Sequence, residues 1–167
     1  YGGWYIDIGI SFFDGGVFRL KDNIEMVYFW DLGDGLSPFR RFYDCMNGLL
    51  YSKPNNPILK TAIDLVVENC RNKFYGSDSA SPTGPGVLGR AIVMHGKTDN
   101  HYDGHFLMLT PHHAQRNRAY VLRNGMILAW HRTKIYPLKQ TLTDIGIKGC
   151  NDYRQLWADR QVYKYQI

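Results

Sequence analysis

Cysteine is scarce in this chain, and no stretch is apolar enough to cross a membrane. Its three cysteines, Cys45, Cys70 and Cys150, are far apart, odd in number and without a CxxC pair. They therefore predict neither a disulfide framework nor a zinc ribbon. The longest apolar run is far shorter than the roughly 20 residues of a membrane-spanning helix. Nothing resembles a signal peptide, and no Asn-x-Ser/Thr glycosylation site occurs. We expect reduced thiols and a cytoplasmic protein.

Signature motifs of several large protein classes are also absent. The chain has no Gly-x-Ser-x-Gly elbow of the serine hydrolases and no GxGxxG or Walker motif. It has no helix-turn-helix, zinc-finger or RNA-recognition signature either. The net charge is +5 and the pI about 9.1, but no five basic residues follow one another. This balance tolerates anionic partners such as nucleotide diphosphates or membrane phosphates, and we do not expect nucleic acid as the partner.

Aromatic side chains, by contrast, are abundant: the chain has 12 Tyr, 8 Phe and 4 Trp, and it is 44% hydrophobic and 21% charged. Such a composition favours a β-rich core, with stacking faces for sugars or bases as the alternative. At 167 residues the chain is long enough to bury most of its apolar surface in one domain. No internal repeat or linker divides it, so we expect a single domain over residues 1–167.

Apolar periodicity and turn residues predict a mixture of strands and helices. We expect strands over 4–10, 24–30, 49–52 and 106–109, and a hairpin of 119–123 with 126–130. Asn124-Gly125 predicts the hairpin turn, because a type I′ turn requires positive φ twice. Helices are expected from residue 57, over about 86–94 and from about 153. Asn55 or Asn56 would cap the first of them, with Pro57 in its first turn, and Asn151 or Asp152 would cap the last. This mixture indicates an α/β fold with a mixed sheet.

Three short segments carry candidate chemistry. In Tyr1–Gly9, two adjacent glycines precede a strand that presents one carboxylate, Asp7. Adjacent glycines allow positive φ and close approach of a bulky ligand, and a strand-end carboxylate suits a metal bound to substrate phosphates. The second segment is the helix start Asn55-Asn56-Pro57. In the third, Thr83-Gly84-Pro85, we expect outward N–H groups at a helix N-terminus to favour an anion or acceptor. The alternative for this loop is a rigid cap.

These segments, in this order, resemble a family of sugar transferases related to fungal α-mannosyltransferases and bacterial capsular polysaccharide transferases. The first resembles the family signature Tyr-Gly-Gly-x-Tyr-x-Asp-x-Asp, the DXD motif. The second, with residues 47–53 before it, resembles a family strand carrying Asn that is followed by a His/Asn-Pro helix start, and the third resembles the family's Thr-Gly-Pro loop. The resemblance covers about residues 1–90. It implies the C-terminal part of a nucleotide-diphospho-sugar transferase fold of the GT-A type, an α/β fold with a mixed sheet. The chain would then be a single, incomplete glycosyltransferase domain.

The resemblance also implies an activity and a site. The activity is transfer of a hexose from a nucleotide diphosphate sugar to a saccharide acceptor in polysaccharide or glycan synthesis, with peripheral membrane association allowed. The donor-binding residues would be Tyr1, Gly2, Gly3, Tyr5, Asp7, Thr83, Gly84 and Pro85. Mn²⁺ or Mg²⁺ would be held by Asp7 and by His131, which ends the hairpin. No catalytic residue is assigned.

The chain departs from the family signature at Gly9, which stands in place of the second Asp. Asp14, His131 or water would then complete the metal site, or dependence on the metal would be weak. The alternative function is a catalytically inactive module that binds a sugar nucleotide or a saccharide, and a basic nucleic-acid-binding domain comes third. We expect the glycines, Asp7, the Thr83-Gly84-Pro85 loop and His131 to share one concave face. We also expect exposed apolar side chains along the sheet edge, with Trp4, Tyr5 and Phe12 as the candidates.

Overall fold

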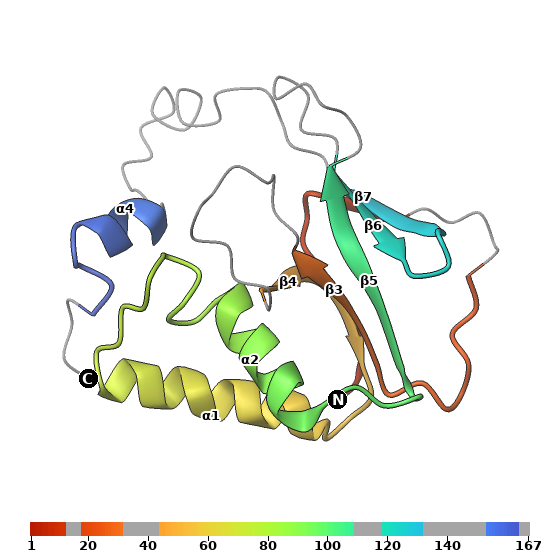
Figure 1. Ribbon diagram of the computed structural model, residues 1–167, viewed down its shortest axis with the longest axis horizontal. Coiled ribbons are helices and arrows are strands. Elements are labelled where there is room, and N and C mark those ends of the chain that lie inside the picture. Colours follow the sequence, from red (N-terminus) through yellow and green to blue (C-terminus); the bar gives the residue numbers. More distant parts are fainter. Residues whose placement is uncertain (13–17, 32–43, 109–117, 132–152, 164–167) are drawn as a thin grey trace.

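The computed structural model describes residues 1–12, 18–31, 44–108, 118–131 and 153–163 (Figure 1). The strands are β1 (Gly3–Ile6), β2 (Ile10–Phe12), β3 (Met26–Asp31), β4 (Cys45–Ser52), β5 (His101–Met108), β6 (Arg118–Leu122) and β7 (Ile127–His131). The helices are α1 (Pro57–Arg71), α2 (Pro85–His95) and α4 (Tyr153–Ala158). All seven strands form one sheet, in the order β1-β4-β3-β5-β6-β7-β2.

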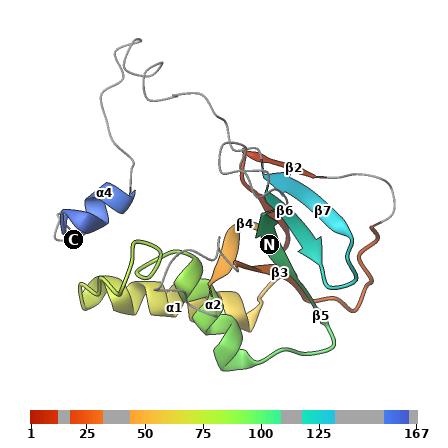
Figure 2. The ribbon, with the colours of Figure 1, turned by 45° about the horizontal axis from the view of Figure 1, so that its top comes forward.

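The sheet is mixed and curls until its two outer strands approach each other. Among the described strands, only β3 and β5 pair in parallel, and the other neighbours are antiparallel. This parallel pair is possible because β4 returns the chain to the end of the sheet where β3 begins, and α1 and α2 then carry it across to β5. At the two ends of the sheet order, Trp4 of β1 and Phe12 of β2 place their rings 5.2 Å apart. The result is a near-closed, barrel-like sheet, and its curvature is visible in Figure 2.

The predicted GT-A-type α/β fold is therefore wrong. Such folds alternate parallel strands with helices that cover both faces of an open sheet. Here a curled, mainly antiparallel sheet dominates, and α1 and α2 pack against a single face of it, on the left in Figure 1. A mixed sheet is present, as the sequence indicated, but its mixture comes from the single parallel pair of β3 with β5.

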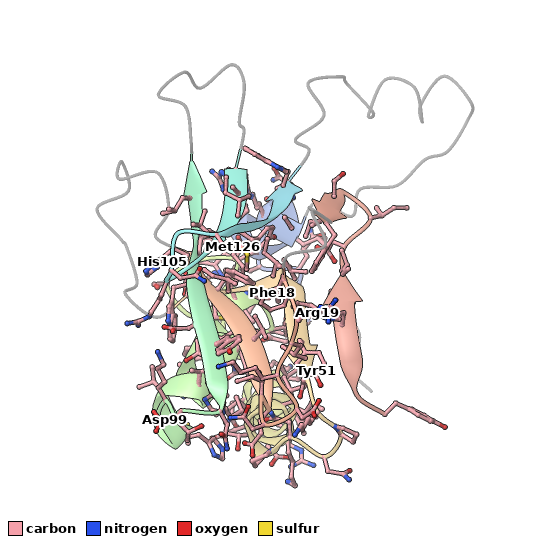
Figure 3. The ribbon with its side chains drawn as sticks, turned by 90° about the vertical axis from the view of Figure 1, so that its right-hand side faces the viewer. Phe18, Arg19, Tyr51, Asp99, His105 and Met126 are labelled. Carbon is pink, nitrogen blue, oxygen red and sulfur yellow. The ribbon has the colours of Figure 1, made fainter. Side chains whose placement is uncertain are left out.

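Strand β3 lies inside the sheet, between β4 and β5, and contributes to two cores. Met26 and Tyr28 face α1 and α2, while Val27 and Phe29 face the inside of the curled sheet. All four side chains are buried, which explains why this strand is apolar at successive positions instead of alternating. Figure 3 shows the sheet face turned away from the helices, where Phe18 and Met126 lie against the inner core.

Local signals placed the helix α1 and the hairpin correctly. Asn56 caps α1, and its Oδ1 accepts from the N–H of Ile58 at 2.9 Å, with Pro57 as the first helical residue. The hairpin forms from β6 and β7, but only Gly125 has positive φ, 85°, so the turn is not of type I′. Instead the Asn124 side chain accepts from the N–H of Met126. The predicted cap of α4, at 151–152, lies outside the described residues.

The predicted single strand over 4–10 is instead two strands. The N–H of Ile10 donates to the carbonyl of Asp7 at 2.9 Å, which turns the chain between β1 and β2. Strands β1 and β2 are the first and the last strand in the sheet order. Both edge strands of the sheet therefore come from one apolar run of the sequence. Of the side chains expected to be exposed there, Tyr5 is 54% and Phe12 is 37% exposed. Trp4 is half-buried because Phe12, Phe18 and Tyr51 pack around it.

Candidate functional site

Titratable side chains from five strand ends meet at one end of the curled sheet. Asp7 follows β1, Asp31 ends β3, Asp44 precedes β4, Arg118 begins β6 and His131 ends β7. Strand pairing brings these residues together. Arg118 of β6 is the register partner of His131 of β7, and the N–H of Asp31 donates to the carbonyl of Asp44 at 2.8 Å.

These five side chains line one cavity of about 730 Å³. Its other walls include Thr83, Gly84 and Pro85 at the start of α2, and Arg154 of α4. Ligand sites are typically concavities of this size with a few convergent polar groups. The cavity is therefore a candidate site.

Asp7 is held at the cavity by neighbours on β1 and β4. The hydroxyl of Tyr5 donates to its Oδ1 at 2.7 Å, and this hydrogen bond to a carboxylate raises the pKa of Tyr5. The N–H of Asp7 donates to the carbonyl of Gly48 at 2.8 Å. A Cβ at Gly48 would lie 2.8 Å from Asp7 Oδ2 and 3.3 Å from Tyr120 Oη. Glycine at this position thus leaves room for the Asp7 carboxylate to rest against β4.

Tyr120 places a phenol beneath the carboxylates. Its side chain is fully buried, and its hydroxyl has no hydrogen-bond partner among the described residues. Burial, with the negative charges of Asp7 and Asp31, raises the pKa of Tyr120 far above its usual range. The hydroxyl therefore stays protonated and remains a donor at this end of the sheet.

The surroundings of His131 favour the uncharged form of its imidazole. Burial and then the positive charge of Arg118 lower its pKa, while the carboxylate of Asp7 acts in the opposite direction. Its ring lies edge-on to Phe106 with the centroids 5.9 Å apart. A neutral imidazole beside a carboxylate can accept a proton or bind a metal ion.

The Thr83-Gly84-Pro85 loop forms a wall of the cavity, but its helix amides are already used. The N–H groups of Gly84 and Gly86 both donate to the carbonyl of Ala80, and Pro85 has no N–H. On the other side, buried Asn69 of α1 donates to the carbonyl of Pro82 at 2.8 Å. At Gly84 and Gly86 the outward N–H groups expected from the sequence are therefore not available, and the loop is a rigid cap.

The remaining predicted donor-binding residues lie elsewhere. Tyr1, Gly2, Gly3 and Tyr5 line a second cavity of about 660 Å³, between β1 and α1. Gly3 has the positive φ that the glycine pair predicted, 130°. The structure thus brings Asp7, the Thr83-Gly84-Pro85 loop and His131 onto one concave face, whereas the two glycines open onto another. Tyr5 connects the two cavities through its hydrogen bond to Asp7.

The predicted metal ligands, Asp7 and His131, share the first cavity. The described residues contain no group of three His, Cys, Asp or Glu side chains that could hold a metal ion. Mg²⁺ at substrate phosphates is commonly held by one or two carboxylates, with the phosphates and water completing the shell, and Asp7 fits that role. The imidazole of His131 is a weaker match, because Mg²⁺ and Mn²⁺ prefer oxygen ligands. Asp14, the other substitute considered, lies outside the described residues.

Sequence reasoning missed Asp31, Asp44, Arg118 and Arg154, which also line the cavity. A signal existed for Asp31, because it ends an apolar strand as a carboxylate does in the first segment. Asp44 and Arg118 belong to no motif, and only the strand pairing reveals their position.

Comparisons with protein-family models, with curated proteins and with solved structures found no match to this chain. Among the described helices, none has the length and apolar character needed to cross a membrane.

Proposed function

We propose that this protein is a glycosyltransferase that transfers a hexose from a nucleotide diphosphate sugar to a saccharide acceptor. The observation that carries the proposal is the shared cavity. Asp7, Thr83-Gly84-Pro85 and His131 are separated by up to about a hundred and twenty residues in sequence, yet they line one concave surface. Two of these elements come from the segments that resemble the sugar-transferase motifs, and His131 was expected there for the same reason.

The chemistry of the cavity suits a sugar donor. Carboxylates accept hydrogen bonds from sugar hydroxyls, and Asp7, Asp31 and Asp44 offer three of them on neighbouring strand ends. Mn²⁺ or Mg²⁺ held by Asp7, His131 and the donor phosphates would offset the charge that develops on the leaving diphosphate. The rigid loop at the start of α2 would shape the wall against which the donor or the acceptor lies.

Isothermal titration calorimetry on the full chain with UDP-hexoses and GDP-hexoses, with and without Mn²⁺, tests the proposal. We expect one nucleotide family to bind, Mn²⁺ to strengthen binding, and Asp7→Ala to abolish most of it. Asp64→Ala is the matched control, because it removes an exposed carboxylate of α1 that pairs with Lys60 and lies away from the cavity. Wild-type protein that binds neither nucleotide, or that binds equally well after Asp7→Ala, would contradict the proposed site.

Two further measurements separate the alternatives. Release of free nucleoside diphosphate in the presence of saccharide acceptors distinguishes a transferase from an inactive binding module. RNA binding that weakens steeply with salt and ignores Asp7→Ala would favour the nucleic-acid interpretation instead.

A further inference from the structure

Arg118 is held in the cavity by an aromatic ring instead of an acidic partner. Its guanidinium carbon lies 5.4 Å from the centroid of Phe106, and it makes no ion pair with a carboxylate of the described residues. The contrast with Arg123, at the opposite end of β6, is clear, because Arg123 binds Asp103 at 2.6 Å. A half-buried arginine stacked on a ring keeps its planar set of N–H donors available.

The cavity needs such a group if it binds a diphosphate. Helix N-termini commonly bind phosphate through free amides, but the amides of Gly84 and Gly86 are bonded to Ala80. The carboxylates of Asp7 and Asp31 repel phosphate. Arg118 supplies fixed positive charge on the β6 side of the cavity, next to His131 across the ladder.

We propose that Arg118 binds the diphosphate of the nucleotide sugar and so orients the donor in the cavity. This inference rests on the proposed function. The guanidinium donates paired N–H groups to phosphate oxygens, a geometry that lysine cannot reproduce. With the diphosphate held at Arg118, the sugar extends toward the carboxylates on β1, β3 and β4, which are complementary to its hydroxyls. Arg118 is thus a specificity-determining residue for the charged part of the donor.

The test compares Arg118→Gln and Arg118→Lys with the wild-type protein, using whichever of UDP and GDP binds it. Arg118→Gln should weaken binding of the diphosphate at least about tenfold, the lower range expected for a charged hydrogen bond. The affinity of Arg118→Lys for the diphosphate should lie between those of wild type and Arg118→Gln, because lysine keeps the charge and loses the paired N–H geometry. Affinity for the corresponding nucleoside, measured by NMR titration, should not change, because a nucleoside has no phosphate.

Arg71→Gln is the matched control, since it removes the same charge from the exposed end of α1. Circular dichroism checks that each variant is folded. If Arg118→Gln does not fold, the comparison of Arg118→Lys with wild type still tests the inference. Diphosphate affinity that is unchanged in both variants, or that falls by the same factor for the nucleoside, would overturn the role of Arg118. If Asp7→Ala abolishes binding while the Arg118 variants do not, only this inference fails. If wild-type protein binds neither UDP nor GDP, the proposed function fails with it.

Discussion

Replacement of Asp103 by asparagine should destabilise the fold by about 2 kcal/mol, an amount set by how its two partners are exposed. The Asp103 side chain is 2% exposed, and it binds Lys97 Nζ at 2.6 Å and Arg123 Nη2 at 2.6 Å. Breaking a fully buried pair costs about 3–5 kcal/mol, whereas an exposed pair contributes at most about 1 kcal/mol. Lys97 and Arg123 are 44% and 60% exposed, so water can solvate their charges after the substitution. The loss should therefore fall between these limits.

The dependence of this loss on pH provides the sharper test. Burial alone would raise the pKa of Asp103, but the hydrogen bonds and charges of Lys97 and Arg123 outweigh it and hold the pKa below the usual 3.8. The ion pairs thus contribute stability above pH 3.8, and the contribution disappears as the pH falls through the lowered pKa.

Urea unfolding followed by tryptophan fluorescence gives the free energy of unfolding of wild type and of Asp103→Asn at about pH 7 and in strong acid. The difference between the two proteins should be smaller in strong acid. Asp64→Asn is the control, because its exposed pair with Lys60 should contribute at most about 0.5 kcal/mol. A loss as small as that of the control, or one that persists in acid, would refute the reasoning.

Two further predictions concern the cavity itself. Gly48→Ala should change the free energy of unfolding by less than about 1 kcal/mol, because the Asp7 carboxylate can swing away from the new Cβ; calorimetry should nevertheless show weaker nucleotide-sugar binding, and full affinity would contradict the proposed contact. NMR titration should give His131 a pKa below 6.5, and that pKa should rise after Arg118→Gln and fall after Asp7→Asn, since these charges act in opposite directions; a pKa that moves in neither variant would mean that the three groups do not interact.

The sequence predicts the elements whose causes are local. Asn56 and Pro57 define the start of α1 because capping and a fixed φ act within one turn. Asn124-Gly125 predicts the hairpin of β6 with β7 in the same way, although the asparagine is used through its side chain and not through a left-handed backbone.

The curvature of the sheet and most of the site depend on pairing between distant segments. Nothing in the run from 4 to 10 shows that its two halves pair with β4 and β7 at opposite ends of the sheet order. Gly9 was treated as the loss of a metal ligand, yet it also lies in the turn that separates β1 from β2. Asp44 and Arg118 are ordinary residues in sequence, and only the ladder brings them to the same cavity. A resemblance of short motifs could locate Asp7 and the loop, but it did not define the fold around them.

The charged side chains at the two ends of strand β6 have different partners. One end carries ion pairs that stabilise the fold, and the other end faces the candidate site. At its C-terminal end, Arg123 and Lys97 neutralise the buried carboxylate of Asp103, so these groups are already satisfied within the fold. At its N-terminal end, Arg118 rests on a ring, and the buried hydroxyl of Tyr120 has no partner among the described residues. A buried polar group that has no hydrogen-bond partner lowers the free energy of unfolding of the protein, unless a ligand or water binds it. A ligand that brings its own negative charge to the cavity would supply the partner that Arg118 does not have among the described residues.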